Sequence, residues 1–337
     1  MTIGGNVRAY VTGATGFLGG RLARSLLADD VAVAVLARNP ERAADLVGAG
    51  ATVVLGDVAD EPSALAVAMR GHDVVYHLAA IYEIGTRDAA LMERINVGGT
   101  RNVLAAARDA GVSTVVYCSS TVALGATAPG EVGDEEKAES AGGFVTPYEA
   151  TKRAAHIVAE AAADEGQDVR IACPNVVYGP GDTSENGAML KMWAHGLLPL
   201  VPFPKAEYGY VHVDDVVDGL RAIADRGVRG RSYVLGGERT TQLGFLRAAA
   251  SALGKRGPRG RPTALAKVAA PMSGPFLARF GLPRALLRES ARMLDHRGWA
   301  YGSGRAEREL GYTWRPLAEG MPETVAWARA TPVRTPH

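Results

Sequence analysis

Thr12-Gly13-Ala14-Thr15-Gly16-Phe17-Leu18-Gly19-Gly20 is the stretch that decides the fold of this chain. A short apolar run precedes it, and an amphipathic helix is expected after it over 17–28. In this context Gly13 permits a tight turn, Gly16 lets backbone approach a pyrophosphate, and Gly19 lets the helix pack closely on the strand. The phosphates then meet the free N–H groups at the helix N-terminus. The pattern predicts a dinucleotide-binding α/β fold, and a purely structural turn is the alternative.

The second apolar run, 31–37, indicates which dinucleotide binds. It ends at Arg38, and no carboxylate follows before Glu41. An acidic residue at such a strand end accepts from the ribose 2′-hydroxyl of NAD, whereas an arginine accommodates the 2′-phosphate of NADP. The charge pattern therefore favours NADP(H), with NAD as the alternative cofactor. The competing interpretation is that Arg38 and Arg42 are solvated residues at the start of a helix.

Short runs rich in Val, Ile and Ala alternate with helical patterns through residues 1–175, which is typical of a doubly wound parallel sheet. We therefore expect a Rossmann-type NADP-binding domain over 1–175, to which a segment near 212–235 returns. Residues 176–330 are expected to form a smaller, mostly helical C-terminal substrate domain, with an apolar helical cap over 262–287. The strands of the first domain are expected near 7–11, 31–37, 52–55, 73–78, 114–119 and 169–174.

The composition argues against several function classes. A net charge of +1 over 337 residues indicates no polyanionic partner and no charged membrane surface. Cys118 and Cys173 lie in apolar runs, so we expect small buried residues in a reducing compartment instead of a disulfide or a metal pair. The seven histidines show no ligand spacing, so no metal site is expected.

No stretch reaches the roughly 18 unbroken apolar residues of a membrane span, and no signal peptide precedes the first strand. We therefore expect a soluble, cytoplasmic protein without a membrane or nucleic-acid partner. Its expected partner is a small-molecule substrate, and a homodimer is the candidate assembly.

A second stretch, Thr146-Pro147-Tyr148-Glu149-Ala150-Thr151-Lys152, constrains the chemistry. The threonine suits a helix N-cap, the proline suits the first helical position, and the glutamate completes a capping box. Tyr148 and Lys152 then lie one turn apart on one helix face. A tyrosine normally titrates near about 10, so the ammonium favours the phenolate but seldom makes a tyrosine a usable acid or base by itself. We expect the lysine and the positive ring of a bound cofactor to do so together. The same spacing also occurs by chance, and the glycine stretch weighs against that interpretation.

Further motifs follow one another along nearly the whole chain. The matching segments are TGATGFLGG (12–20), LGDV (55–58), HLAA (77–80), INVGGT (95–100), YCSS (117–120), YEATK (148–152), CPNVVYGPGD (173–182) and YVHVDD (210–215). With these motifs the chain resembles the extended short-chain dehydrogenase/reductases of the NAD-dependent epimerase/dehydratase family. Within that family it is most similar to the dihydroflavonol-reductase/3β-hydroxysteroid-dehydrogenase-like ketone reductases and to the hopanoid-associated epimerase-like proteins.

The resemblance implies roles for individual residues. Ser120, Tyr148 and Lys152 are implied as the catalytic group, in which the serine donates to the substrate oxygen, the tyrosine passes the proton and the lysine bonds the nicotinamide ribose. Asn96 is expected to pin neighbouring backbone, and Ser119 to satisfy backbone groups at its strand end. The residues expected at the cofactor are Gly13, Thr15, Gly16, Phe17, Leu18, Gly19, Arg38, Asp57, Val58, Leu78, Ala79, Ala80, Tyr148, Lys152, Pro174, Asn175 and Val177.

The residues expected to face the substrate are mainly apolar and aromatic, which suits a hydrophobic carbonyl compound. They are Tyr82, Ile84, Ser120, Thr121, Val122, Val176, Tyr178, Met189, Met192, Trp193 and Tyr208. Several of them, the methionines above all, have an equal claim to be core residues. Sugar-nucleotide epimerases of the resembling branch carry an arginine just before the YVHVD strand, where this chain has Tyr208-Gly209. Arg292 and Arg297 are candidates for a second such arginine.

The sequence therefore predicts an NADPH-dependent ketoreductase or alcohol dehydrogenase that acts on a hydrophobic or aromatic carbonyl compound by a Ser-Tyr-Lys mechanism. The alternative is a nucleotide-sugar 4-epimerase/dehydratase that uses bound NAD. A remote alternative is a non-catalytic NADP-sensing protein, which would usually lack the tyrosine or the lysine.

Overall fold

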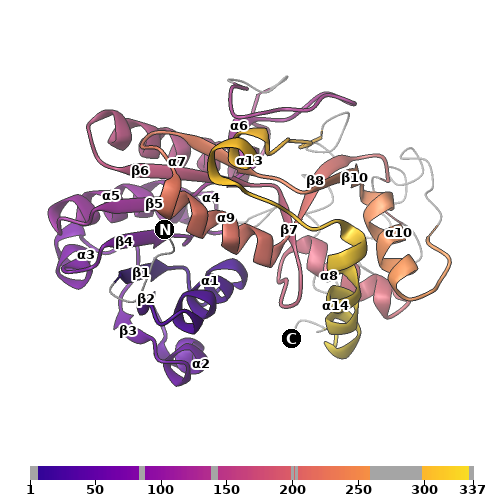
Figure 1. Cartoon of the computed structure of the whole chain (residues 1–337), viewed down its shortest axis with the longest axis horizontal. Coiled ribbons are helices and arrows are strands. Elements are labelled where there is room, and N and C mark those ends of the chain that lie inside the picture. The colour runs from indigo at the N-terminus through magenta and orange to yellow at the C-terminus, as the bar shows by residue number, and fades with distance from the viewer. Residues whose placement is uncertain are drawn as a thin grey trace.

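The larger lobe of the protein is built on a seven-stranded sheet with the order β3-β2-β1-β4-β5-β6-β9 (Figure 1). The computed structural model describes residues 7–82, 88–137, 143–198, 201, 204–258 and 298–333. Every neighbouring pair in the sheet is parallel, so the predicted Rossmann-type doubly wound fold is confirmed. The strands are β1 (Arg8–Thr12), β2 (Ala32–Ala37), β3 (Thr52–Leu55), β4 (Val74–His77), β5 (Thr114–Cys118), β6 (Val169–Pro174) and β9 (Ser232–Leu235).

Helices cover both faces of this sheet. One face carries α3 (Pro62–Met69), α5 (Gly99–Asp109) and α7 (Pro147–Asp164); the other carries α1 (Phe17–Ala28), α2 (Ala44–Gly48), α9 (Val213–Arg226) and α13 (Gly304–Leu310). Successive strand residues serve the two faces in turn: in β1, Tyr10 belongs to the first core and Val11 to the second. The strands read as continuous apolar runs because both faces are buried.

The smaller lobe combines a three-stranded sheet with three helices, which Figure 1 shows on the side away from β1 to β3. The strands are β7 (Val176–Tyr178), β8 (Glu207–His212) and β10 (Glu238–Thr241), and the helices are α8 (Glu185–Ala194), α10 (Gln242–Ala252) and α14 (Leu317–Ala330). Tyr178, Tyr210 and Phe245 pack at the centre of its core. The expected helical lobe therefore also contains a small sheet, of which β7 and β10 were not predicted.

The boundary of β8 differs from the expected strand and turn over 210–215. The strand begins earlier and ends at His212, and α9 begins directly afterwards at Val213. His212 caps this helix, because its Nδ1 accepts a hydrogen bond from the Asp214 N–H at 3.3 Å. After α9 the chain returns to the large sheet, where β9 pairs with β6. The residue limits of the two domains stay a prediction, and the expected cap over 262–287 lies outside the described residues.

The first part of the long loop before α7 is held by the C-terminal part of the chain. Thr127 pairs with Gly298, and Gly133 pairs with Tyr301. The Tyr301 hydroxyl donates to the Gly125 carbonyl at 2.7 Å. None of the described helices combines the length and the apolarity that a membrane-spanning helix needs.

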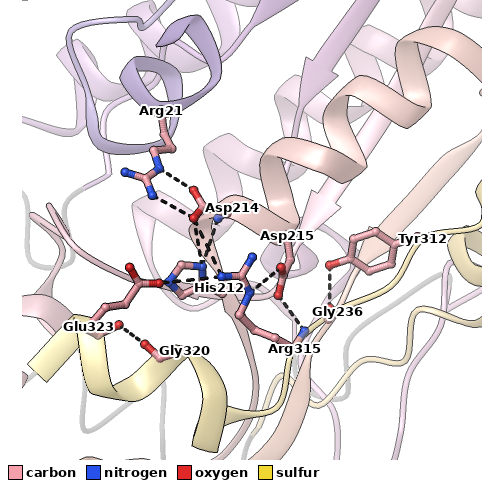
Figure 2. Close-up of polar contacts among 10 residues, drawn as sticks. Arg21, His212, Asp214, Asp215, Gly236, Tyr312, Arg315, Gly320 and Glu323 are labelled. Carbon is pink, nitrogen blue, oxygen red and sulfur yellow. Dashed lines mark hydrogen bonds and ion pairs between the residues drawn. The ribbon is translucent and has the colours of Figure 1, made fainter. Parts of the chain in front are cut away.

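An ion-pair network joins α1 to α9 and to the segment that leads into α14 (Figure 2). Arg21 of α1 makes a two-pronged contact with the Asp214 carboxylate. Asp215 accepts from both the backbone N–H and the Nε of Arg315 at 2.8 Å each. His212 Nε2 lies 3.1 Å from an oxygen of Glu323 in α14.

The spacing of three of these groups invites comparison with a metal site. The ligand atoms of His212, Asp214 and Glu323 lie within 4.8 Å of one another. However, Arg21 binds the Asp214 carboxylate. Arg315 Nη1 lies 4.0 Å from Asp214 Oδ2 and 3.8 Å from Glu323 Oε1. Because guanidinium groups already neutralise these carboxylates, we interpret the cluster as a structural link between the lobes.

This link predicts a stability effect that depends on pH. The Arg21 guanidinium holds the pKa of Asp214 below its usual range, so its contribution is present above the unfolded pKa of about 3.9 and is lost as the pH falls through the folded value. Asp214→Asn should lower the free energy of unfolding by about 1 kcal/mol at pH 7. Urea titrations should show that the difference shrinks below about pH 4.

The matched control is Asp109→Asn, because Asp109 pairs with Arg108 on an exposed surface at 3.4 Å. That substitution should leave the urea midpoint unchanged. Equal midpoints for wild type and Asp214→Asn at pH 7 would show that the link contributes nothing to stability.

Candidate active site

The candidate site lies at the carboxyl ends of β1, β4, β5 and β6. β1 and β4 are neighbours in the sheet, but they are not consecutive in the chain. After β1 the chain adds β2 and β3 on one side of β1, and it then crosses back to place β4 on the other side. Open α/β sheets bind ligands at such a switch point, outside the carboxyl ends of the strands. The sequence motifs of this chain fall at this edge because each follows one of these strands.

Buried hydrogen bonds tie the two strand ends at the switch point together. Thr12 Oγ1 lies 2.7 Å from His77 Nδ1, and His77 Nε2 lies 3.0 Å from Thr100 Oγ1. Thr100 donates its hydroxyl proton to the Asn96 carbonyl, so it accepts from Nε2–H and His77 Nδ1 accepts from Thr12. Burial lowers the pKa of His77 to about 3, with the positive charge of Lys152 as a second cause. The imidazole is therefore neutral.

Asn96 extends this network to the catalytic helix and stands in a π-helical turn, Arg94–Gly98. Its Oδ1 accepts from the Ile81 N–H at 2.7 Å, and its Nδ2 donates to the Ile81 carbonyl and to Thr151 Oγ1. The side chain thus holds the segment after β4 against α7, in the backbone-pinning role that was expected for it. A single π turn inside a helix often marks a functional site.

The glycine turn forms a cradle that side chains would fill. Gly13 has φ +76°, and a Cβ there would lie 2.7 Å from the Ala79 nitrogen; a Cβ on Gly19 would lie 2.3 Å from the Gly13 carbonyl oxygen. Gly16 is exposed and begins α1 without a side-chain cap. The first N–H groups of α1 are therefore open to an anion, which fits the pyrophosphate of a dinucleotide.

The start of α7 fixes Tyr148. Thr146 Oγ1 accepts from the Glu149 N–H, while the Glu149 carboxylate accepts from the Thr146 N–H, so the predicted capping box is present. Tyr148 stands in the first turn with only 7% of its surface exposed. The side chain of Ser120, the N-cap of the short helix α6 (Thr121–Leu124), lies close enough to the phenol to lower its pKa. The structure thus brings together the two hydroxyls that were predicted to face the substrate oxygen.

Lys152 lies one turn further along α7 and is buried. Its Nζ donates to the Cys118 carbonyl at 3.1 Å and lies 5.5 Å from the centre of the Tyr117 ring. Burial lowers the pKa of Lys152, and the two neighbouring cysteines oppose this shift. The lysine therefore has a fixed place beside the end of β5.

The expected phenolate is not what this structure favours. Burial raises the pKa of Tyr148, the Ser120 hydrogen bond opposes the rise, and the negative charge of Glu185 adds to it. Desolvation of the phenol is the largest of these effects. Tyr148 is accordingly protonated at neutral pH.

Ser119 has a different partner from the backbone groups expected for it. Its Oγ lies 2.8 Å from Nδ1 of His156, a buried histidine of α7. Ser119 bonds the His156 side chain instead of backbone groups because α7 packs directly over the end of β5. Both cysteines are free; Cys173 is buried as expected, whereas Cys118 is only half-buried.

The residues predicted at the adenosine end of the cofactor lie after β2 and β3. Arg38 follows β2 with 71% of its side chain exposed, and its Nη1 lies 3.6 Å from Asp57 Oδ2. Val58 is buried against Gly99, and its carbonyl accepts from Asn102. The Arg38 guanidinium is therefore available to solvent or to a ligand phosphate.

The residues predicted near the nicotinamide follow β4 and β6. Leu78 and Ala79 are half-buried and Ala80 is exposed. Asn175 donates from Nδ2 to the Tyr301 carbonyl at 3.0 Å, while its buried Oδ1 has no hydrogen-bond partner among the described residues. Together with the glycine cradle and the open end of α1, this unused acceptor fits a dinucleotide along the strand ends.

The predicted substrate residues divide into two groups. Tyr82 is 44% exposed and meets the Tyr148 ring edge-on at 4.9 Å. Tyr208 is half-buried and stacks on Trp299 at 6.2 Å, and Val122, Val176 and Trp193 are also half-buried.

The second group is packed away from solvent. Tyr178, Met189 and Met192 are core residues of the smaller lobe, and the Thr121 hydroxyl donates to the Pro174 carbonyl. A substrate contact stays a prediction for all of them. Ile84, Arg292 and Arg297 lie outside the described residues.

Glu185 is a residue that the sequence argument missed. It is the first residue of α8, hydrogen-bonds Tyr82 and acts electrostatically on Tyr148. Nearby Asp182 is buried, and its pKa rises to about 6. The only signal in the sequence was a Ser-Glu pair at a helix start, which is common at exposed N-termini.

Comparison with known proteins agrees with this arrangement. The NAD dependent epimerase/dehydratase family matches residues 9–236. The chain belongs to this family. It is therefore an enzyme of the extended short-chain dehydrogenase/reductase type, as the motifs indicated.

Two curated relatives match along nearly their whole length. Sterol demethylase protein B of Methylococcus capsulatus is 33% identical over 325 residues, which cover 95% of this chain and 97% of that protein. The 4-hydroxy-2-methyl-3-oxo-4-farnesyl-3,4-dihydroquinoline-1-oxide ketoreductase of Stigmatella aurantiaca is 30% identical over 313 residues, 92% of each chain.

Solved structures of the family share the fold. The crystal structure of gox2253 matches with a TM-score of 0.80 at 31% identity, over 96% of this chain and 98% of that chain. A DesIV double mutant, a dTDP-glucose 4,6-dehydratase from Streptomyces venezuelae solved with NAD and DAU bound, matches with a TM-score of 0.75 at 27% identity, over 96% and 97%. Family membership thus includes reductases and dehydratases, and the choice between them depends on the site.

The cradle gives a direct test of the cofactor site. Gly19→Ala forces a methyl group against the Gly13 carbonyl, where the Cβ would lie at 2.3 Å, so it should lower the free energy of unfolding by about 1–3 kcal/mol and weaken dinucleotide binding. The measurements are urea unfolding and titration of NADPH fluorescence.

Gly48→Ala is the matched control, because a Cβ at Gly48 meets nothing within 4 Å. It should leave both stability and binding at the wild-type level. Wild-type NADPH affinity in Gly19→Ala would show that the dinucleotide binds elsewhere.

Proposed function

We propose that this enzyme is an NADPH-dependent ketoreductase that reduces a hydrophobic or aromatic ketone, or catalyses the reverse oxidation. The observation that carries the proposal is the grouping of Tyr148, Ser120 and Lys152 at the end of β5, where the Ser120 side chain acts on the phenol and Lys152 donates to the Cys118 carbonyl. This group lies along the same strand ends as the glycine cradle. A bound nicotinamide supplies or accepts the hydride.

The chain's own groups supply the proton and the field. In reduction, Ser120 and Tyr148 donate hydrogen bonds to the carbonyl oxygen, and Tyr148 transfers its proton to that oxygen as negative charge develops there. A pKa raised by burial suits this task, because the phenol stays protonated until the substrate needs the proton. Lys152, fixed on the Cys118 carbonyl, lies beside the reacting groups and is proposed to bond the ribose hydroxyls.

The half-buried substrate candidates support a hydrophobic ketone. Tyr82, Val176, Trp193 and Tyr208 offer aromatic and aliphatic surface, which suits an apolar compound with one polar group at the reaction centre. The relative from Stigmatella aurantiaca is named as a ketoreductase of a farnesyl-bearing compound. That name gives the substrate class independent support.

Tyr208 and Gly209, the two residues before the YVHVD segment, argue against nucleotide-sugar chemistry. Tyr208 stacks on Trp299, and Gly209 lies where a Cβ would come 1.9 Å from Asn175 Nδ2. Neither position presents the arginine that the resembling epimerases use for a pyrophosphate. Reduction of a ketone therefore ranks above epimerisation or dehydration of a sugar nucleotide.

Tyr148→Phe tests the mechanism. It removes one hydroxyl, so the fold and NADPH binding should persist while kcat falls at least about 100-fold, because the proton donor is lost. The assay is the loss of NADPH absorbance with a panel of cyclic and aryl ketones, run beside UDP-glucose epimerisation.

Tyr10→Phe is the control, because it removes a hydroxyl with no hydrogen-bond partner among the described residues from the core of the larger lobe and should retain turnover. Near-normal kcat in Tyr148→Phe would refute the proposed mechanism. A purified protein that carries stoichiometric NAD and interconverts a UDP-sugar would reverse the ranking of the two functions.

Arg38 carries the proposed preference for NADP(H). NADPH should bind at least about tenfold tighter than NADH, and Arg38→Ala should erase most of that margin, because a charge-assisted phosphate contact is lost. Fluorescence titrations with NADPH and with NADH measure the two Kd values and hence this margin. Arg42→Ala, an exposed arginine four residues on, should keep the margin; equal Kd values in the wild type would show that Arg38 does not select the cofactor.

A further inference from the structure

One face of α7 contacts three consecutive residues at the end of β5. Tyr148, Lys152 and His156 recur every four residues and therefore lie in one row. Their partners are, in order, the Ser120 hydroxyl, the Cys118 carbonyl and the Ser119 hydroxyl. The catalytic pair thus belongs to a longer row whose third member takes no part in the mechanism above.

The hydrogen bonds of His156 define its ring orientation. The side chain is fully buried, with Nδ1 2.8 Å from Ser119 Oγ. Nε2 lies 3.3 Å from Glu160 Oε1 and 3.3 Å from Ser232 Oγ. A carboxylate only accepts, so Nε2 is the nitrogen that carries a proton towards Glu160, and in the tautomer protonated on Nε2 the Nδ1 accepts from the Ser119 hydroxyl.

Ser120 depends on Ser119 for its place. Ser119 is buried and tied on both sides, by its N–H to the Ala172 carbonyl at 2.8 Å and by its hydroxyl to His156. Ser120 is half-buried and extended; its hydroxyl accepts a 3.2 Å bond from the Val122 N–H, and its carbonyl accepts a 3.0 Å bond from the Ala123 N–H. The start of α6 therefore holds Ser120 on one side, and Ser119 holds it on the other.

We propose that His156 is a positioning residue that, through Ser119, sets the Ser120 hydroxyl at its distance from Tyr148. The inference rests on the proposed function, because it needs Ser120 and Tyr148 to act on one substrate oxygen. A displacement of about 1 Å in such a group costs up to about 100-fold in rate. His156 itself touches neither the reacting groups nor the substrate.

Four single variants and the double variant Ser119→Ala/His156→Leu separate positioning from simple packing. Ser119→Ala and His156→Leu remove the bond from either side, and His156→Asn keeps an acceptor near the place of Nδ1. Ser232→Ala is the matched control, because it removes a partner of the same ring from the other nitrogen. Each is assayed for kcat and KM with the best ketone found for the wild type, for NADPH Kd, and for the urea midpoint.

We expect Ser119→Ala and His156→Leu each to lower kcat about 10- to 100-fold, with NADPH Kd within about twofold of wild type. The double variant should be no slower than the worse single one, because both remove one interaction. His156→Asn should recover part of kcat, and Ser232→Ala should leave it unchanged. Wild-type kcat in Ser119→Ala, or an equal loss in Ser232→Ala, would overturn the proposal.

A measurement without turnover keeps this inference separate from the proposed function. In ¹⁵N-histidine NMR spectra, the His156 Nδ1 signal should show an unprotonated, hydrogen-bonded nitrogen that changes in Ser119→Ala. A protonated Nδ1 would contradict the proposal even in an active enzyme. If the wild type reduces no ketone but shows this signal, the ketoreductase assignment is refuted and the hydrogen bond of His156 still stands. The kcat values of the variants would then be compared in the UDP-glucose reaction.

Discussion

The buried hydrogen-bond chain from Thr12 through His77 and Thr100 to Asn96 is the constraint on which the site depends. It crosses the switch point of the sheet and reaches α7 through Thr151. Each member has its donors and acceptors matched, and removal of one would leave a buried polar group unsatisfied at a cost of about 1–3 kcal/mol. The glycine cradle and the catalytic helix are thereby held in one frame, although they are more than a hundred residues apart in sequence.

Burial, more than charge, sets the protonation states around the reaction centre. It raises the pKa of Tyr148 and lowers that of Lys152, so both groups move towards their neutral forms before any ligand enters. Glu185 strengthens the effect on the phenol. These shifts support the proposed role of Tyr148 as a proton donor in reduction.

Local signals in the sequence were sufficient for the glycine turn, the strands of the large sheet and the capping box at Thr146, because each rests on contacts within a few residues. The strands β7 and β10 were missed, since their pairing with β8 joins segments far apart in the chain. The Ser119–His156 bond and the influence of Glu185 on Tyr148 were missed for the same reason. The burial that raises the pKa of Tyr148 was also missed, because burial cannot be read from a helical spacing.

The fit of Asn175 against Gly209 restricts what can stand at position 209. A Cβ at 209 would lie only 1.9 Å from the Asn175 amide, so any side chain there requires the amide to move. The amide in turn holds the Tyr301 carbonyl from the C-terminal part of the chain. A larger residue at 209 would therefore loosen the attachment of that part of the chain to the strand ends, and positions 175 and 209 are mechanically coupled.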